Sequence, residues 1–190
     1  MNNSIEQIRE VIENSRSIAI AGHISPDGDA VASCCAVAMA LNKIGKKTKV
    51  FLEEIPENFR TIPYSENALQ DEPNEDFDLF ISLDCGDDNR LGKNASLVKN
   101  TCTVNIDHHI SNNYFGTYNY VDAEASSTSE IIYRLLDGWC QIDKNIAYAI
   151  YTGIIFDTGC FKHSCTSPYT MKIAGELMTY NIPFTEIQEK

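Results

Sequence analysis

Acidic and histidine side chains follow apolar runs at three places in this 190-residue chain. The run "SIAIAG" is followed by "HISPDGDA", the run "DLFISL" by an aspartate, and the run "CTVNI" by "DHH". Short apolar runs bounded by polar residues are typical of buried parallel strands, and the carboxyl ends of such strands meet at one edge of a sheet. We therefore expect the following side chains to lie together there: His23, Asp27, Asp29, Asp84, Asp107, His108 and His109.

A cluster of this composition is suited to divalent cations. Buried carboxylates repel one another and lose hydration, so they need protons or bound cations to compensate. Oxygen-rich sites with one or two imidazoles favour Mn²⁺, with Mg²⁺ or Fe²⁺ as alternatives, whereas structural zinc sites usually include thiolates. Asp157 in "GIIFDTGCF" is a further candidate, because it follows an apolar helical stretch where a core position would favour Ile or Leu.

Each of these residues also has an ordinary structural interpretation. Asp27 and Asp29 are in the pattern of a helix cap and first turn, where acids are favoured. Asp84 is placed to begin a turn, His23 to be a loop residue, and Asp157 to form a local turn with the next threonine. The coincidence of so many metal-binding residue types at strand and helix ends favours the metal site.

The elements that must position these residues alternate between strand and helix. The patterns predict strands at 17–22, 48–52, 78–84 and 102–107, and helices at 4–14, 29–44, 127–138, 144–159 and 167–183. The helix at 144–159 has an alternative form that is broken near Gly153. Residues 53–78 read as an irregular connection. This alternation predicts an α/β domain, with a mainly parallel sheet flanked by helices and the metal site at the carboxyl ends of the strands.

The composition limits which kinds of partner the protein is expected to bind and where in the cell it is expected to be. A net charge of −12 excludes a broad basic face that would hold long duplex nucleic acid. Seven cysteines without a C-x-x-C pair are typical of reduced thiols in a cytoplasmic protein. The polar, amphipathic start lacks a secretory signal pattern, and no apolar run approaches the roughly 18 residues of a membrane span. We therefore expect a soluble, cytoplasmic protein that has no membrane partner.

Four motifs, in chain order, resemble those of the DHH phosphoesterase superfamily: "HISPDGDA", "SLDCGD", "NIDHH" and "FDTGCF". That superfamily includes RecJ-like exonucleases, exopolyphosphatases, family II pyrophosphatases and cyclic-dinucleotide phosphodiesterases. The strings "ASSTSEIIY" and "TGCFKHSCT" resemble its bacterial branch of nanoRNA-degrading enzymes, which also remove the 3′-phosphate from adenosine 3′,5′-bisphosphate (pAp). The resemblance extends from His23 to Thr166.

The resemblance implies two divalent cations, normally Mn²⁺, and a role for each motif residue. The implied ligands are His23 and Asp27 for one ion, Asp29 and His108 for the other, Asp84 as a bridge and Asp157 completing the set. It implies that Asp107 orients His108, and that His109 faces the substrate as a phosphate contact or proton donor. Water activated by the two cations would then attack phosphorus in line.

Two further residues are predicted to touch the substrate. Arg90 follows the second motif and is placed to contact a phosphate, and His163 follows the fourth motif and is placed to line the cleft. A solvent-facing position is the alternative for each. The serines and threonine of "ASST" could also approach the site, but capping of the next helix explains them equally well.

The predicted function is hydrolysis of short oligoribonucleotides, pAp or both. The alternatives within the superfamily are a cyclic-dinucleotide phosphodiesterase and an inorganic pyrophosphatase or exopolyphosphatase. A noncatalytic nucleotide-binding regulatory module is the alternative from another class.

The resemblance implies that residues 1–190 are the catalytic DHH domain. Members of this branch usually carry a second, glycine-rich domain that completes the substrate cleft, and the sequence does not contain it. The last residues, "FTEIQEK", read as the start of a linker, so we expect a boundary within a longer protein, with a naturally shortened protein as the alternative. A homodimer is left open.

Overall fold

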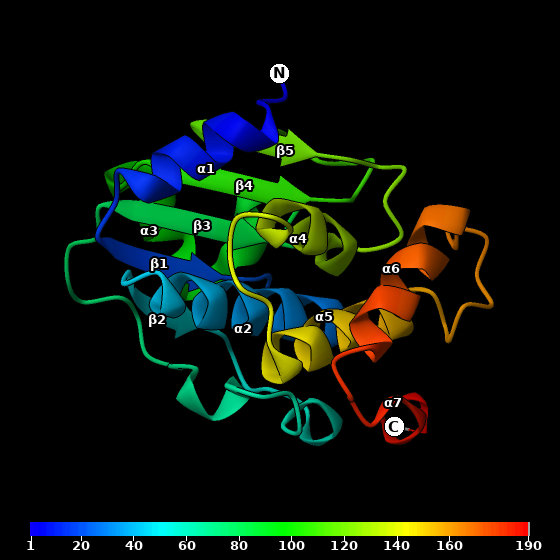
Figure 1. The fold of residues 1–190 in the computed structure, drawn as a ribbon. Coiled ribbons are helices and arrows are strands. Elements are labelled where there is room, and N and C mark those ends of the chain that lie inside the picture. The colour runs from blue at the N-terminus through cyan, green and yellow to red at the C-terminus, as the bar shows by residue number, and fades with distance from the viewer. Residues whose placement is uncertain (190) are drawn as a thin grey trace.

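Five parallel strands form a single sheet in the computed structural model, which describes residues 1–189 (Figure 1). The strand order is β2-β1-β3-β4-β5, and every neighbouring pair is parallel. The strands are β1 (Ser17–Ala21), β2 (Lys47–Phe51), β3 (Leu79–Leu83), β4 (Thr103–Asp107) and β5 (Tyr118–Val121). All strands therefore run in one direction, and their carboxyl ends form one rim.

Helices cover the two faces of the sheet unequally. The helices are α1 (Ile5–Glu13), α2 (Gly28–Lys43), α3 (Ala95–Asn100), α4 (Thr128–Leu136), α5 (Lys144–Asp157), α6 (Pro168–Met178) and α7 (Phe184–Gln188). Figure 1 shows α1, α2, α4 and α5 on one face and α3 on the other. Alternation along β1 matches this arrangement, because Ile18 and Ile20 join the larger core while Ala19 and Ala21 join the smaller one.

Local sequence explains where the helices that frame the rim begin and end. Asp27, Ser127 and Asp143 cap α2, α4 and α5, each with a side-chain oxygen that accepts backbone N–H groups. Gly45 has a φ of +83°, as expected for a residue that ends α2 in the left-handed region. These caps place the first turns of α2 and α4 beside the carboxyl ends of the strands.

The structure confirms the predicted α/β class and corrects several details. Helix α5 is continuous from Lys144 to Asp157, so the alternative break at Gly153 is wrong. Strand β5 was not predicted, because a four-residue edge strand with alternate polar positions carries little signal. Residues 184–188, expected to start a linker, form α7, and Ile187 is buried. Lys190 lies outside the described residues.

None of the helices between residues 1 and 189 is both long enough and apolar enough to cross a bilayer.

Candidate metal centre

The loop from β1 to α2 contributes His23 and Asp27, and the first turn of α2 contributes Asp29. His23 is 5% exposed, and its Nε2 lies 3.7 Å from an Asp27 carboxylate oxygen. Asp27 also caps α2, because its Oδ1 accepts the backbone N–H groups of Asp29 and Ala30 at 3.1 Å each. The capping and metal interpretations of Asp27 are therefore compatible, since one oxygen caps the helix and the other faces His23.

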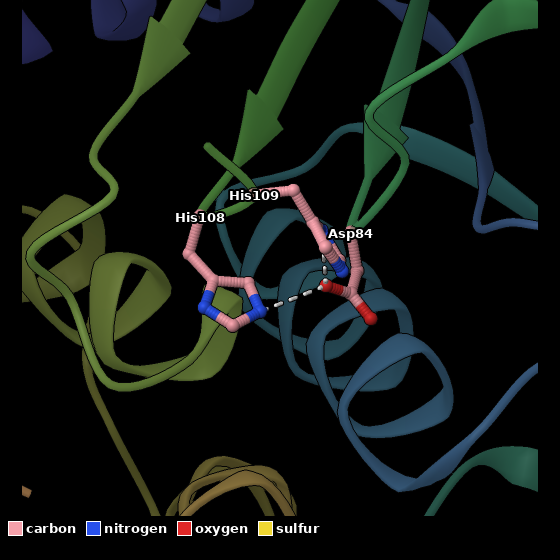
Figure 2. Close-up of side chains that lie close together, drawn as sticks. All are labelled: Asp84, His108 and His109. Carbon is pink, nitrogen blue, oxygen red and sulfur yellow. Dashed lines mark ion pairs between the residues drawn. The ribbon is translucent and has the colours of Figure 1, made fainter. Parts of the chain in front are cut away.

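Asp84, directly after β3, lies at the centre of the cluster. Its backbone has a φ of +55°, a strained region for a residue other than glycine. One carboxylate oxygen lies 3.7 Å from His23 Nε2, and the other lies 3.6 Å from His108 Nε2. Figure 2 shows His108 and His109 approaching Asp84 from the neighbouring strand end. The side chain is 1% exposed, so its charge is almost wholly removed from water.

The adjacent histidines after β4 have different partners. His108 Nε2 lies 3.0 Å from an Asp157 carboxylate oxygen, at the last residue of α5. His109 Nδ1 lies 2.7 Å from Asp107 Oδ1. Asp107 was expected to orient His108, and the structure instead places its carboxylate against His109. The reason is geometric: the chain turns after β4, so the ring of residue 109 folds back over the strand end while that of 108 reaches α5.

Asn112, which sequence reasoning missed, fixes this arrangement. Its side-chain amide donates to Asp107 Oδ2 at 2.7 Å and to Asn105 Oδ1 at 2.8 Å. Both acceptors are fully buried. The Asp107 carboxylate is thus held between an amide and an imidazole, which explains why its pKa is lowered despite burial.

Burial and mutual repulsion raise the pKa of three carboxyl groups in the cluster. Burial, together with the charge of Asp84, raises the pKa of Asp29 to about 7. Burial and the charges of Asp157 and Asp27 raise the pKa of Asp84 to about 7. The pKa of Asp157 rises to about 6, again through burial first and then Asp29. Without a cation, the chain therefore favours protons on these acids.

The pKa values of His108 and His109 are also raised, which favours the charged form of a histidine. Burial lowers the pKa of His108, but its hydrogen bond to Asp157 and the charges of Asp29 and Asp84 outweigh burial and raise it to about 10. The hydrogen bond that His109 donates to Asp107 likewise raises the pKa of His109. Carboxylates that surround an imidazolium in this way favour positive charge at this point, which is the electrostatic pattern that suits a divalent cation.

The donor atoms are close enough to share cations. Three groups have potential ligand atoms within 4.8 Å of one another: His23, Asp27 and Asp84; Asp84, His108 and His109; and Asp29, His108 and Asp157. Asp84 and His108 each belong to two groups, so the three are contiguous. All six predicted ligands are brought together, and their carboxylate and imidazole donors fit Mn²⁺, Mg²⁺ or Fe²⁺. Which ligand binds which ion stays a prediction.

The two predicted substrate contacts border opposite ends of this cluster. Arg90 is exposed, and its Nη2 lies 3.2 Å from His23 Nδ1. His163 is also exposed, and its Nδ1 lies 2.9 Å from the backbone carbonyl oxygen of Asp157. Each therefore presents a cationic or polar group next to a candidate ligand, and neither is part of the ligand groups.

Comparison with known proteins identifies the family. The model of the DHH family, N-terminal domain, matches residues 17–154. This chain belongs to the DHH family. It is 32% identical over 183 residues to the bifunctional oligoribonuclease and PAP phosphatase NrnA of Bacillus subtilis, an alignment that covers 90% of this chain and 55% of that protein. The chain spans little more than half the length of the curated relatives it matches.

Solved structures share the fold of this DHH chain. An exopolyphosphatase-related protein from Bacteroides fragilis superposes with a TM-score of 0.86 at 26% identity, covering 96% of this chain and 58% of that one. Exonuclease RecJ bound to manganese superposes with a TM-score of 0.59 at 14% identity, covering 100% of this chain and 51% of that one. At that identity, the likeness to RecJ is one of fold.

Proposed function

We propose that this chain is the catalytic domain of a metal-dependent phosphoesterase that acts on short oligoribonucleotides, on pAp or on both. The observation that carries the proposal is the set of three contiguous donor groups at the carboxyl ends of the strands, joined by Asp84 and His108. Asp29, Asp84 and Asp157 are buried close together, and buried carboxylates need protons or cations to compensate their charge. The name of the Bacillus subtilis relative supports the choice of substrate.

We propose that the cluster holds two divalent cations, with Mn²⁺ as the first choice. When bound, such a pair activates water for attack on phosphorus and neutralises charge on the phosphoryl oxygens. His23 and Asp27 would hold one cation and Asp29 and His108 the other, with Asp84 shared and Asp157 completing the set, in keeping with the donor groups.

His109 is proposed to face the substrate. Asp107 accepts the Nδ1 proton, so Nε2 is left to contact a phosphate or to hold the proton that the leaving oxygen needs. The side chain is 37% exposed, which leaves it open to a ligand. Asp107 then acts through His109, by fixing its ring orientation and favouring its charged form.

Arg90 and His163 are proposed to contact phosphates at the two ends of the cluster. An exposed guanidinium suits bidentate contact with a phosphate. The net charge of −12 leaves no broad basic surface for a long strand, so the substrate is proposed to be short. We also propose a cytoplasmic location, which fits seven cysteines that are all free thiols.

The experiment is a hydrolysis assay with the metal-free chain, to which Mn²⁺, Mg²⁺ or Fe²⁺ is returned. The substrates are the dinucleotide pApA, pAp, a cyclic dinucleotide and inorganic pyrophosphate. We expect Mn²⁺-dependent release of product from pApA or pAp, and none in EDTA. Preferred hydrolysis of pyrophosphate or of the cyclic dinucleotide would replace the proposed substrate class. Tight nucleotide binding without turnover would favour a regulatory module instead.

A further inference from the structure

The first turn of α4 contacts two of the candidate metal ligands at once. The backbone N–H of Thr128 donates to Asp29 Oδ2 at 2.6 Å, and that of Ser129 donates to Asp29 Oδ1 at 2.9 Å. The Thr128 hydroxyl donates to Asp84 Oδ1 at 3.0 Å. One residue thus links a carboxylate that follows β1 to a carboxylate that follows β3. All of these groups are buried.

These contacts account for the N–H groups of the first three residues of α4. A helix leaves its first N–H groups without an intrahelical partner. Ser127 Oγ accepts the N–H of Glu130, and the two oxygens of Asp29 accept the N–H groups of Thr128 and Ser129. A capping box, in which the Glu130 side chain would bond back to Ser127, does not form, because that carboxylate accepts from Ser126 and Thr170 instead.

Each bonded carboxylate keeps lone pairs for a cation. A carboxylate offers about four acceptor positions, and the contacts from α4 use one on each Asp29 oxygen and one on Asp84 Oδ1. Hydrogen bonds of this kind fix the rotation of a ligand and favour its charged form, and they tune metal affinity in known sites.

The close approach of α5 holds this turn in place. A Cβ added at Gly153 would lie 2.5 Å from Asp29 Oδ1 and would also overlap the Ser129 side chain. Only a glycine at that point of α5 leaves room for Asp29 to sit against the α4 turn. Sequence reasoning noted both "ASST" and Gly153 without connecting them, because they are joined only in the folded chain.

We propose that Thr128 is a positioning residue, whose backbone and hydroxyl together hold Asp29 and Asp84 in the orientation that binds divalent cations. The inference rests on the metal site of the proposed function and adds to it a residue outside the ligand groups. A purely structural role is the competing interpretation, since any buried hydroxyl bonded to a carboxylate stabilises a fold.

The chain supplies a matched control for that interpretation. Thr170 is also fully buried, and its hydroxyl donates to a Glu130 carboxylate oxygen at 2.7 Å, outside the ligand groups. T170V and T128V each remove one buried hydroxyl from one buried carboxylate with little change in shape, and T170V also removes the acceptor for the Ser167 N–H in the capping box of α6. T128S keeps the hydroxyl and serves as the conservative variant.

The experiment measures Mn²⁺ affinity by calorimetry and thermal unfolding in EDTA for the wild type and the three variants. We expect T128V to weaken Mn²⁺ binding about tenfold or more, and T128S and T170V to stay within about threefold of the wild type. T170V should lower the unfolding temperature in EDTA at least as much as T128V, because it also breaks the capping box of α6. T128A replaces T128V if the valine variant does not fold.

Wild-type affinity in T128V, or equal weakening in T128V and T170V, would overturn the inference. Failure of this inference can be distinguished from failure of the proposed function. If Mn²⁺ binding depends on Thr128 but the chain hydrolyses no substrate, the proposed function is contradicted and the inference about Thr128 is supported. A wild-type chain that binds no Mn²⁺ would remove both.

Discussion

The carboxylates of Glu130 and Asp84 are almost equally buried, but their partners differ in kind. Glu130 accepts hydrogen bonds from the hydroxyls of Ser126 and Thr170, and Arg134 lies 4.0 Å away. Asp84 accepts one hydroxyl, and burial and then the charges of Asp157 and Asp27 raise its pKa. The first acid has its neutralising partners within the chain, and the second is surrounded by further acids and by imidazoles.

This difference separates a structural acid from a functional one. A buried charge that the chain itself pairs and hydrogen-bonds needs nothing further. A group of buried acids that repel one another is incomplete until a proton or cation joins it. Asp84 therefore marks the functional site, because the acids around it do not neutralise its charge. Variants of Asp84 and Glu130 test this difference.

The largest expected effect is on turnover when the acid at the centre of the cluster is neutralised. D84N should lower hydrolysis of the best substrate by at least about 10³-fold, because several kcal/mol of transition-state stabilisation depend on the cations. E130Q keeps an oxygen acceptor for both hydroxyls and should retain activity within a few-fold. Initial rates of hydrolysis in Mn²⁺ are measured for both variants. Equal losses of activity in D84N and E130Q would contradict the proposed difference between the two acids.

A smaller effect, on Mn²⁺ affinity, is expected when a methyl group is added next to Asp29. G153A should weaken Mn²⁺ affinity roughly 10–100-fold, because the added methyl group must displace Asp29 or the α4 turn that holds it. G175A is the matched control: it adds the same group to α6, where nothing lies within 4 Å. That variant should bind Mn²⁺ normally and gain about 0.5–1 kcal/mol of stability. Calorimetry on both would test this, and normal binding by G153A would contradict it.

The smallest expected effect is a pH dependence of stability in the metal-free chain. The pKa values of Asp29 and Asp84 rise from 3.8 to about 7 on folding, and that of His108 from 6.5 to about 10. The folded state therefore binds more protons than the unfolded chain over this range, and stability falls as pH rises. In EDTA the unfolding temperature should drop by about 4 °C or more between about pH 5 and about pH 8.

Saturating Mn²⁺ is the control for that experiment. Cations compete with the protons, so the fall with rising pH should disappear or reverse when Mn²⁺ is present. An unfolding temperature in EDTA that stays constant or rises over the same range would show that the acids are already satisfied by the chain, as Glu130 is.

The sequence alone predicted the α/β class and the gathering of six candidate ligand residues. Both predictions follow from the spacing of the apolar residues and from the common direction of parallel strands. Apolar runs that end in acids place those acids at one rim of any parallel sheet. The contacts of Asp107 with His109, and of Thr128 with Asp84, could not be predicted. The first depends on how the chain turns after β4, and the second joins residues 44 positions apart through the placement of α4.

The central claim is that this rim binds a pair of divalent cations. Crystals of the chain grown with Mn²⁺ and measured for anomalous scattering test it most directly. The account predicts two peaks about 3.5–4 Å apart among the six ligand residues, with Asp84 contacting both. A rim without manganese, or manganese bound only elsewhere on the chain, would contradict it.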